Sequence, residues 1–293
     1  MQRQLWKQIV EQLRRIGKGR KNASCTFSDE MIVKVWFWAV INDRPVSWAC
    51  CQRNWPLYEQ RWQRPSESTM SRRLRSETVM CLLLAIKHEV LNPPALVTLL
   101  WFLDGKPLVI SGCSKDRQSG YGRAARGMAR GYKLHVLLGK TGAIAAWRVA
   151  PMNKDERVMG RRMLLSAEIK GYVLGDGNYD SNKLHAVCDQ KGNLQLLTPR
   201  RYGPGYGFGH RRQTVGRMRS VQLLENPSPE FGEWLLHQRV DIERFFGNLT
   251  NWGGGLTHLP PWARTHRRVH RWVQGKLILN GLKRTAQTMT YVN

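Results

Sequence analysis

Three carboxylates in this chain lie at positions that suit chemistry, and acids are otherwise scarce. Asp104 ends the apolar run Trp-Phe-Leu-Asp-Gly, and Asp176 ends a second run, Tyr-Val-Leu-Gly-Asp-Gly. Glu243 lies in a predicted helix whose apolar residues would anchor it to a core. Since α/β sheets bind their ligands at the C-terminal ends of strands, Asp104 and Asp176 are candidate site residues.

Three converging carboxylates are typical of a site that holds two divalent cations roughly 4 Å apart and acts on phosphodiester bonds. Mg²⁺, or Mn²⁺ in its place, suits such a site because it takes hard oxygen ligands. We therefore interpret Asp104, Asp176 and Glu243 as catalytic, metal-binding residues. In the alternative interpretation, the two aspartates cap turns or helices and Glu243 pairs with Arg239 one helical turn earlier.

The charge balance indicates a polyanionic partner. The 293 residues include 47 Lys and Arg against 21 Asp and Glu, for a formal net charge of +26. A hydrophobic share of 42% is typical of a folded protein and too high for a disordered one. Nucleic acid is the commonest polyanion that such a chain meets. The six cysteines form no Cys-x-x-Cys pair, which argues against a disulfide framework or a zinc ribbon.

An anionic membrane is the rival partner, but the sequence does not favour it. No apolar stretch approaches the roughly 18 residues of a membrane span, and neither a lipidation signal nor a basic amphipathic helix is evident. The N-terminus lacks the apolar region of a signal peptide. We expect a cytoplasmic protein without membrane contact, associated with the nucleoid when it is bound to DNA.

The positive charge is segregated into three long stretches that contain no acid. Residues 117–154, residues 190–224 and the segment after Glu243 carry eight, seven and eight Lys or Arg, respectively. A solvated surface would interleave the two signs. We interpret the three stretches as a surface that follows a phosphate backbone.

Residues 1–92 are expected to form a small, all-helical DNA-binding region. Apolar spacing and caps predict helices over 6–16, 28–41, 45–51 and 77–91. Another helix follows Pro65 and carries hydroxyls and then arginines, as a helix that enters a DNA groove does. Arg72, Arg73 and Arg75 are its candidate DNA contacts. The alternative is the solvated face of an ordinary helical bundle.

Residues 93–293 are expected to form an α/β domain. Strands are predicted over 96–103, 133–138, 143–149, 172–175 and 194–197, and helices over 155–169, 181–190 and 233–249. The first strand is apolar throughout, as a strand covered on both faces is. This order of elements predicts a mixed sheet flanked by helices.

Two basic segments of this domain are expected to be irregular. The glycine-rich segment 111–131 is predicted to be a flexible loop that closes over DNA near the site. An insertion at about 199–232 interleaves aromatic residues with arginine, as surfaces that stack single strands do. Its candidate DNA contacts are Arg200, Arg201, Arg211 and Arg212. The alternative for this insertion is a disordered linker.

In their order and context, the three acidic motifs resemble those of the DDE transposases of bacterial insertion sequences. Asp104-Gly105 is similar to their first motif, and Gly-Asp-Gly-Asn-Tyr-Asp-Ser around Asp176 is similar to their second. Arg239-x-x-x-Glu243, followed by Arg-Phe-Phe-Gly-Asn-Leu, is similar to their third. The resemblance covers roughly residues 96–285.

The resemblance implies a ribonuclease-H-like catalytic domain that cleaves DNA at terminal inverted repeats and joins the freed 3′-hydroxyl to target DNA. It implies a Mg²⁺ or Mn²⁺ cofactor, a homodimer that pairs two transposon ends, and a DNA or phosphate contact for Arg239. Many relatives carry a Tyr and a Lys where this chain has Leu236 and Thr250. The resemblance therefore implies the metal-binding acids but not the end-DNA contacts attributed to those two side chains.

Two other functions remain open. A ribonuclease-H-like nuclease without strand transfer would use the same acids but would not need the N-terminal helical region. A catalytically decayed relative would bind DNA without cleaving it. The presence of all three acids in their motifs favours an active transposase.

Overall fold

The computed structural model describes residues 2–17, 25–93, 98–112, 114–201, 213–225, 230–251 and 255–290. Its contacts divide the chain into two units. The helical unit comprises Met1–Pro93, Asn251–Leu256 and Arg271–Asn293, and the sheet unit comprises Pro94–Thr250 and Thr257–His270. The segment 271–293, expected in the second domain, thus clusters with the N-terminal helices.

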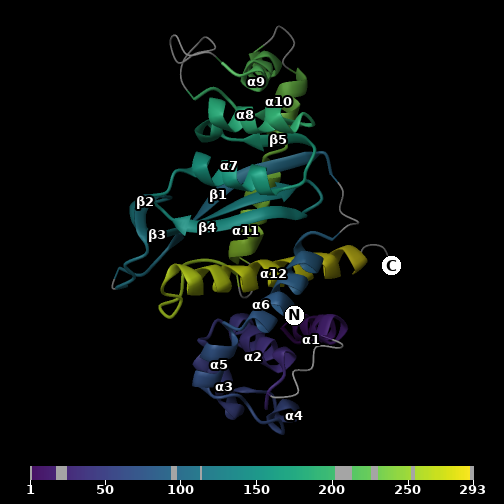
Figure 1. Ribbon diagram of the computed structural model, residues 1–293, viewed down its shortest axis with the longest axis vertical. Coiled ribbons are helices and arrows are strands. Elements are labelled where there is room, and N and C mark those ends of the chain that lie inside the picture. Colours follow the sequence, from purple (N-terminus) through teal and green to yellow (C-terminus); the bar gives the residue numbers. More distant parts are fainter. Residues whose placement is uncertain are drawn as a thin grey trace. The chain divides into compact units, whose positions relative to one another are not determined.

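The helical unit contains the helices expected from the sequence (Figure 1). They are α1 (Gln2–Gly17), α2 (Asp29–Ile41), α3 (Val46–Cys50), α5 (Glu67–Arg73) and α6 (Glu77–Leu91), with the short helices η1 (Gln52–Asn54) and α4 (Leu57–Gln60) in addition. The hydroxyl of Ser28 accepts a hydrogen bond from the backbone N–H of Met31 at 3.2 Å and caps α2. The rings of Trp6, Trp38 and Trp55 pack together in the core of this unit.

The end of the chain joins this core through α12 (His266–Thr290). Buried Lys276 donates hydrogen bonds to the backbone carbonyl of Val40 at 3.1 Å and to Asp43 Oδ1 at 2.5 Å. The side chain of Gln274 reaches the carbonyl of Leu83. Hydrophobic periodicity does not show which core a helix packs against. The sequence therefore gave no sign that this segment belongs to the helical unit.

The sheet unit contains a mixed sheet, as expected, and this sheet has six strands rather than the five that were predicted (Figure 1). Its strands are β1 (Leu100–Val109), β2 (Gly120–Ala124), β3 (Gly127–Gly139), β4 (Ile144–Pro151), β5 (Gly171–Gly175) and β6 (Leu194–Leu197). The order is β2-β3-β1-β5-β6, with β4 also paired to β3. β3 runs antiparallel to β1, β2 and β4, and β5 and β6 run parallel to β1. This is the ribonuclease-H-like arrangement that the resemblance implies.

The sheet is covered on both faces, as the apolar first strand predicted. Trp101, Phe102 and Leu103 are all buried, although successive side chains point to opposite faces. The core beside Leu103 includes residues of α7 (Glu156–Ser166) and α8 (Asn182–Lys191). In Figure 1, α7 lies in front of the strands and α11 (Val240–Asn251) passes behind them.

Three segments differ from the sequence prediction. β1 continues five residues past Asp104, because the segment after Asp104 pairs with β3. The expected loop over 111–131 contains β2, which forms a hairpin with the start of β3; its glycines concealed the strand pattern. The helix expected over 233–249 is two helices, α10 (Glu230–His237) and α11, and the insertion also contains α9 (Val215–Glu225).

Candidate active site

The register of two parallel strands brings Asp104 and Asp176 together. Leu103 of β1 pairs with Gly175 of β5, and each aspartate is the next residue of its chain segment. Because neighbouring strands lie about 4.8 Å apart, the two aspartates meet at the point where the parallel pairing ends. Sequence reasoning identified both acids, and the structure shows that they are neighbours.

Backbone and side-chain amides hold both carboxylates in place. Asp104 Oδ1 accepts a hydrogen bond from the backbone N–H of Gly105 at 2.7 Å. Asp176 Oδ1 accepts one from the backbone N–H of Asn178 at 2.9 Å, and its Oδ2 accepts one from Asn178 Nδ2 at 3.2 Å. Asp176 therefore does cap a turn, the short helix η2 (Gly177–Tyr179), while its side chain remains at the site.

The surroundings of Asp104 make its negative charge costly. The pKa of Asp104 is raised to about 6, mainly by burial and to a smaller extent by the charges of Asp176 and Glu156. The hydrogen bond from Gly105 and the positive charge of Arg239 act in the opposite direction. A cation bound beside two such carboxylates would offset their negative charge. This environment therefore stabilises a bound cation.

Glu156 and Arg239 are the two further charges in the field of Asp104. Glu156 is the first residue of α7 and forms an ion pair with Lys133. Arg239 lies between α10 and α11, and its Nε is buried without a hydrogen-bond partner among the described residues. The sequence predicted Arg239 but not Glu156, because periodicity gave the helix without showing that its start lies near Asp104.

Glu243 lies on α11, one helical turn after Arg239, and its side chain is exposed. α11 turns Ile242, Phe245 and Leu249 into the core, which leaves Glu243 on the outer flank. Within the described part of the chain, no three Asp, Glu, His or Cys side chains are close enough to hold a metal ion. The structure thus joins two of the three predicted acids and places the third on an adjacent helix.

Two buried polar rings near this site were not identified from the sequence. The Tyr179 ring is fully buried, and its hydroxyl has no hydrogen-bond partner among the described residues. Burial raises the pKa of Tyr179 well above its usual value, and the charges of Glu156, Asp104 and Asp176 add to this. His135 is fully buried opposite Gly105, and burial lowers its pKa to about 3, so its ring is neutral.

The arginines predicted to contact DNA have different environments. In the helical unit, Arg72 and Arg75 are exposed, but Arg73 is buried. The Arg73 guanidinium donates to the carbonyl of Phe27 at 2.8 Å and to Asp29 Oδ1 at 2.5 Å, so it stabilises the start of α2. Its sequence neighbours gave no sign of this long-range partner.

The arginines of the insertion also differ from one another. Arg200 forms an ion pair with Glu225 at the end of α9. Arg201 is exposed, and its backbone N–H donates to Asp180 Oδ2 at 3.1 Å. Arg211 and Arg212 lie outside the described residues.

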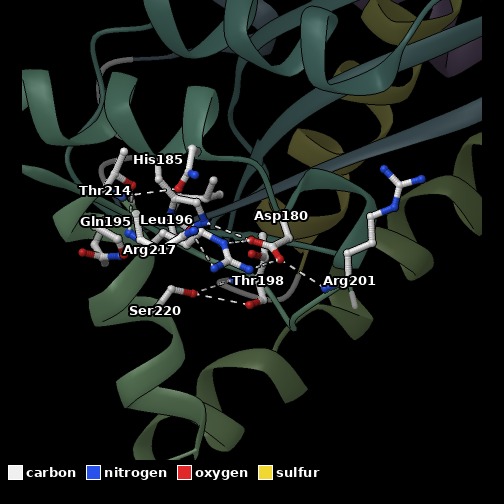
Figure 2. Close-up of polar contacts among 12 residues, drawn as sticks. Asp180, His185, Gln195, Leu196, Thr198, Arg201, Thr214, Arg217 and Ser220 are labelled. Carbon is white, nitrogen blue, oxygen red and sulfur yellow. Dashed lines mark hydrogen bonds and ion pairs between the residues drawn. The ribbon is translucent and has the colours of Figure 1, made fainter. Parts of the chain in front are cut away.

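Asp180 anchors the insertion through a buried ion pair with Arg217 of α9. Figure 2 shows the Arg217 guanidinium turned toward this carboxylate, with Nε–Oδ1 and Nη2–Oδ2 distances of 2.7 Å each. His185 Nε2 lies 3.7 Å from Asp180 Oδ1. Ser220 accepts a hydrogen bond from the backbone N–H of Thr198 at 3.1 Å and so ties α9 to the end of β6.

The burial of Asp104 gives a prediction about stability. Near pH 8, Asp104→Asn is expected to raise the free energy of unfolding of the metal-free protein by about 1–2 kcal/mol. The folded-state pKa lies above the unfolded value of about 3.9, so the folded protein binds the proton more tightly. The wild type therefore loses stability as the pH rises from about 4 to about 6, and the Asn variant does not lose this increment.

Urea unfolding of both proteins between acid and neutral pH measures this difference, which should disappear below about pH 4. Asp155→Asn is the control, because hydrogen bonds from Arg157 lower the pKa of Asp155 and its removal should not stabilise the protein. A lower stability of Asp104→Asn near pH 8 would contradict the conclusion that burial makes the ionised form of Asp104 costly.

The residues at this site fit a hard divalent cation. Asp104 and Asp176 supply carboxylate oxygens from adjacent chain segments, and a cation would offset the burial and the repulsion that together raise the Asp104 pKa. Carboxylates together with water are the ligands that Mg²⁺ and Mn²⁺ take.

The described helices include none that is long and apolar enough to cross a membrane.

Comparison with known families agrees with this geometry. The family model described as "Transposase DDE domain" matches residues 99–278, which is more than half of the chain. The match includes β1 with Asp104, the segment with Asp176 and helix α11 with Glu243. No curated protein and no solved structure matches the chain at a significant level.

Proposed function

We propose a function from the premise that this chain belongs to the DDE transposase family. The protein binds the terminal inverted repeats of an insertion sequence, cleaves DNA strands there and joins the freed ends to target DNA. The observation that supports this most directly is the in-register pair of Asp104 and Asp176 at the end of the parallel strand pairing.

The chain's own residues have distinct roles in this proposal. Asp104, Asp176 and Glu243 hold Mg²⁺ or Mn²⁺, and Arg239 offsets their negative charge or contacts a DNA phosphate. When bound, the two cations supply activation of the attacking oxygen and stabilisation of the leaving one. The positive charge of Arg239 acts on Asp104. Glu243 follows Arg239 by four residues, which corresponds to about 6 Å of helix rise.

DNA contacts are proposed on both units. In the helical unit, exposed Arg72 and Arg75 can reach phosphates or bases, whereas buried Arg73 serves the fold. In the sheet unit we propose contacts by Arg201, by Arg211 and Arg212, and by Arg200 if its ion pair with Glu225 opens. We further propose that two copies act together on paired ends, in the cytoplasm on nucleoid DNA.

The test is incubation of the full chain with Mg²⁺ and a duplex that carries the terminal repeats of its own element. We expect nicks at the repeat ends and joined products in the presence of target DNA, and neither with a scrambled repeat. Digestion without regard to sequence would indicate a nuclease without strand transfer. Specific binding without cleavage would indicate a catalytically decayed relative, and absence of both would overturn the proposal.

The dimer is tested separately by mass photometry or light scattering. We expect complexes with one copy of the protein when each duplex carries a single repeat end, and complexes with two copies when two ends can be paired. A single copy that cleaves at full rate at all concentrations would contradict this part of the proposal.

A further inference from the structure

A basic pocket lies at the outer edge of β4, apart from the acidic site. It has a volume of about 600 Å³ and is bounded by β4, the first turns of α7 and the start of α12. Among the described residues β4 pairs with β3 alone, so its other edge is open. We refer to it as the β4 pocket and define it by Trp147, Arg148, Lys154, Arg162, His266 and His270.

The cations of the β4 pocket have no acidic partner. Arg148, Lys154 and Arg162 are all exposed, and within the described ranges none of them forms an ion pair. The acid in the lining, Asp155, is engaged by the guanidinium of Arg157 at 2.6 Å. Three unpaired positive charges around one hollow create a potential that attracts an anion.

The walls of the pocket are held by specific contacts. His266 Nε2 donates to the backbone carbonyl of Val149 at 2.7 Å and so uses the open edge of β4. The ring of His270 stacks on Trp147, with a centroid separation of 4.5 Å and an interplanar angle of 25°. The cations therefore project from fixed elements, which reduces the ordering cost of binding.

The start of α7 links the β4 pocket to the acidic site. Lys154 and Asp155 directly precede Glu156, whose charge acts on Asp104. A phosphate chain that passes the acids can therefore continue across the start of α7 to the open edge of β4. Its repeated negative charges can engage several cations at once, whereas a single small anion would occupy only part of the pocket.

We propose that the β4 pocket binds the phosphate backbone of the DNA on which the acidic site acts, with Arg148, Lys154 and Arg162 as the phosphate contacts. This inference rests on the proposed function, since it takes DNA as the substrate. Its role is to position the duplex, because phosphate contacts set register and orientation without reading sequence.

The first test is the salt dependence of DNA binding, measured by fluorescence anisotropy without divalent metal, so that it does not depend on cleavage. The double variant Arg148→Gln with Arg162→Gln is expected to reduce the slope of log K against log salt by about 2. The control is Arg161→Gln with Arg219→Gln, which removes the same charge from exposed positions outside the pocket. An unchanged slope, or an equal loss in the control, would overturn the proposal.

The second test uses the wild-type protein. Acetylation of Lys154, followed by mass spectrometry, is expected to slow at least about threefold when DNA is bound, whereas exposed Lys183 should react at an unchanged rate. Equal reactivity of Lys154 with and without DNA would overturn the proposal. Equal protection by inorganic phosphate at the same phosphate concentration would also overturn it and indicate a small-anion site. If the wild-type protein cleaves repeat DNA but either test fails, the pocket alone is refuted.

If the double variant changes the salt slope as expected but the wild-type protein does not cleave, the proposed reaction alone is refuted.

Discussion

Glu243→Gln is expected to lower strand cleavage at terminal repeats by at least about a thousandfold, or about 4 kcal/mol of transition-state stabilisation. The substitution keeps the shape of the side chain but removes the charge that the proposal assigns to metal binding. DNA binding without metal should change less than about threefold, because Glu243 is exposed and its loss adds no repulsion to phosphate. Cleavage rates on labelled repeat DNA at saturating Mg²⁺ measure the effect.

Two matched variants make this prediction specific. Asp241 lies two residues earlier on α11 and forms an ion pair with Lys140. The variant Asp241→Asn should leave cleavage within a few-fold of the wild type. Glu156→Gln tests the other acid, since Glu156 acts on Asp104 in the structure and Glu243 is not among the charges that shift its pKa. If Glu156→Gln abolished cleavage while Glu243→Gln preserved it, the third acid would be Glu156 and our assignment would be wrong.

Arg217→Met is expected to destabilise the sheet unit by about 3–5 kcal/mol, because it leaves the carboxylate of Asp180 buried without its partner. Both side chains are 2% exposed, so water cannot replace the lost guanidinium. The loss should appear as a lower midpoint of urea unfolding and as faster hydrogen exchange in β6, α8 and α9. The control is Arg219→Met on the same helix, which removes an exposed arginine and should cost less than about 0.5 kcal/mol.

The double variant Asp180→Asn with Arg217→Met separates a lost attraction from an uncompensated charge. Since it removes both charges, it should cost clearly less than the sum of the two single variants. Additive losses would show that the two side chains do not act as a pair.

The pH dependence of the wild type gives an independent check on this ion pair. Burial alone would raise the pKa of Asp180, but the neighbouring His185 and the hydrogen bonds from Arg217 lower it well below its usual range. Its stabilising contribution is therefore present above the unfolded pKa of about 3.9 and is lost as the pH falls through the lower folded value. Arg217→Met should show a much smaller loss of stability over this acidic window.

Most of the secondary structure could be predicted from the sequence, because it depends on near neighbours in the chain. The apolar spacing of α2 and α6, the cap at Ser28 and the strand at Leu194–Leu197 are all local features, and all are confirmed. Prediction failed where local signals were weak or concealed. β2 is a glycine-rich strand that depends on its pairing with β3, and α9 depends on the ion pair of Arg217 with a residue 37 positions earlier in the chain.

By itself, the sequence determined the candidate acids, the surplus of positive charge and the family motifs, since residue type and spacing carry that information. Only the tertiary structure decided which groups meet. The parallel register of β1 and β5 made Asp104 and Asp176 neighbours, and the start of α7 brought the charge of Glu156 to act on Asp104. Likewise, Arg73 and Arg217 are buried and serve the fold, whereas Arg148 and Arg162 are exposed at the β4 pocket. Strand register, helix docking and burial depend on contacts between residues far apart in the chain, which local spacing does not encode.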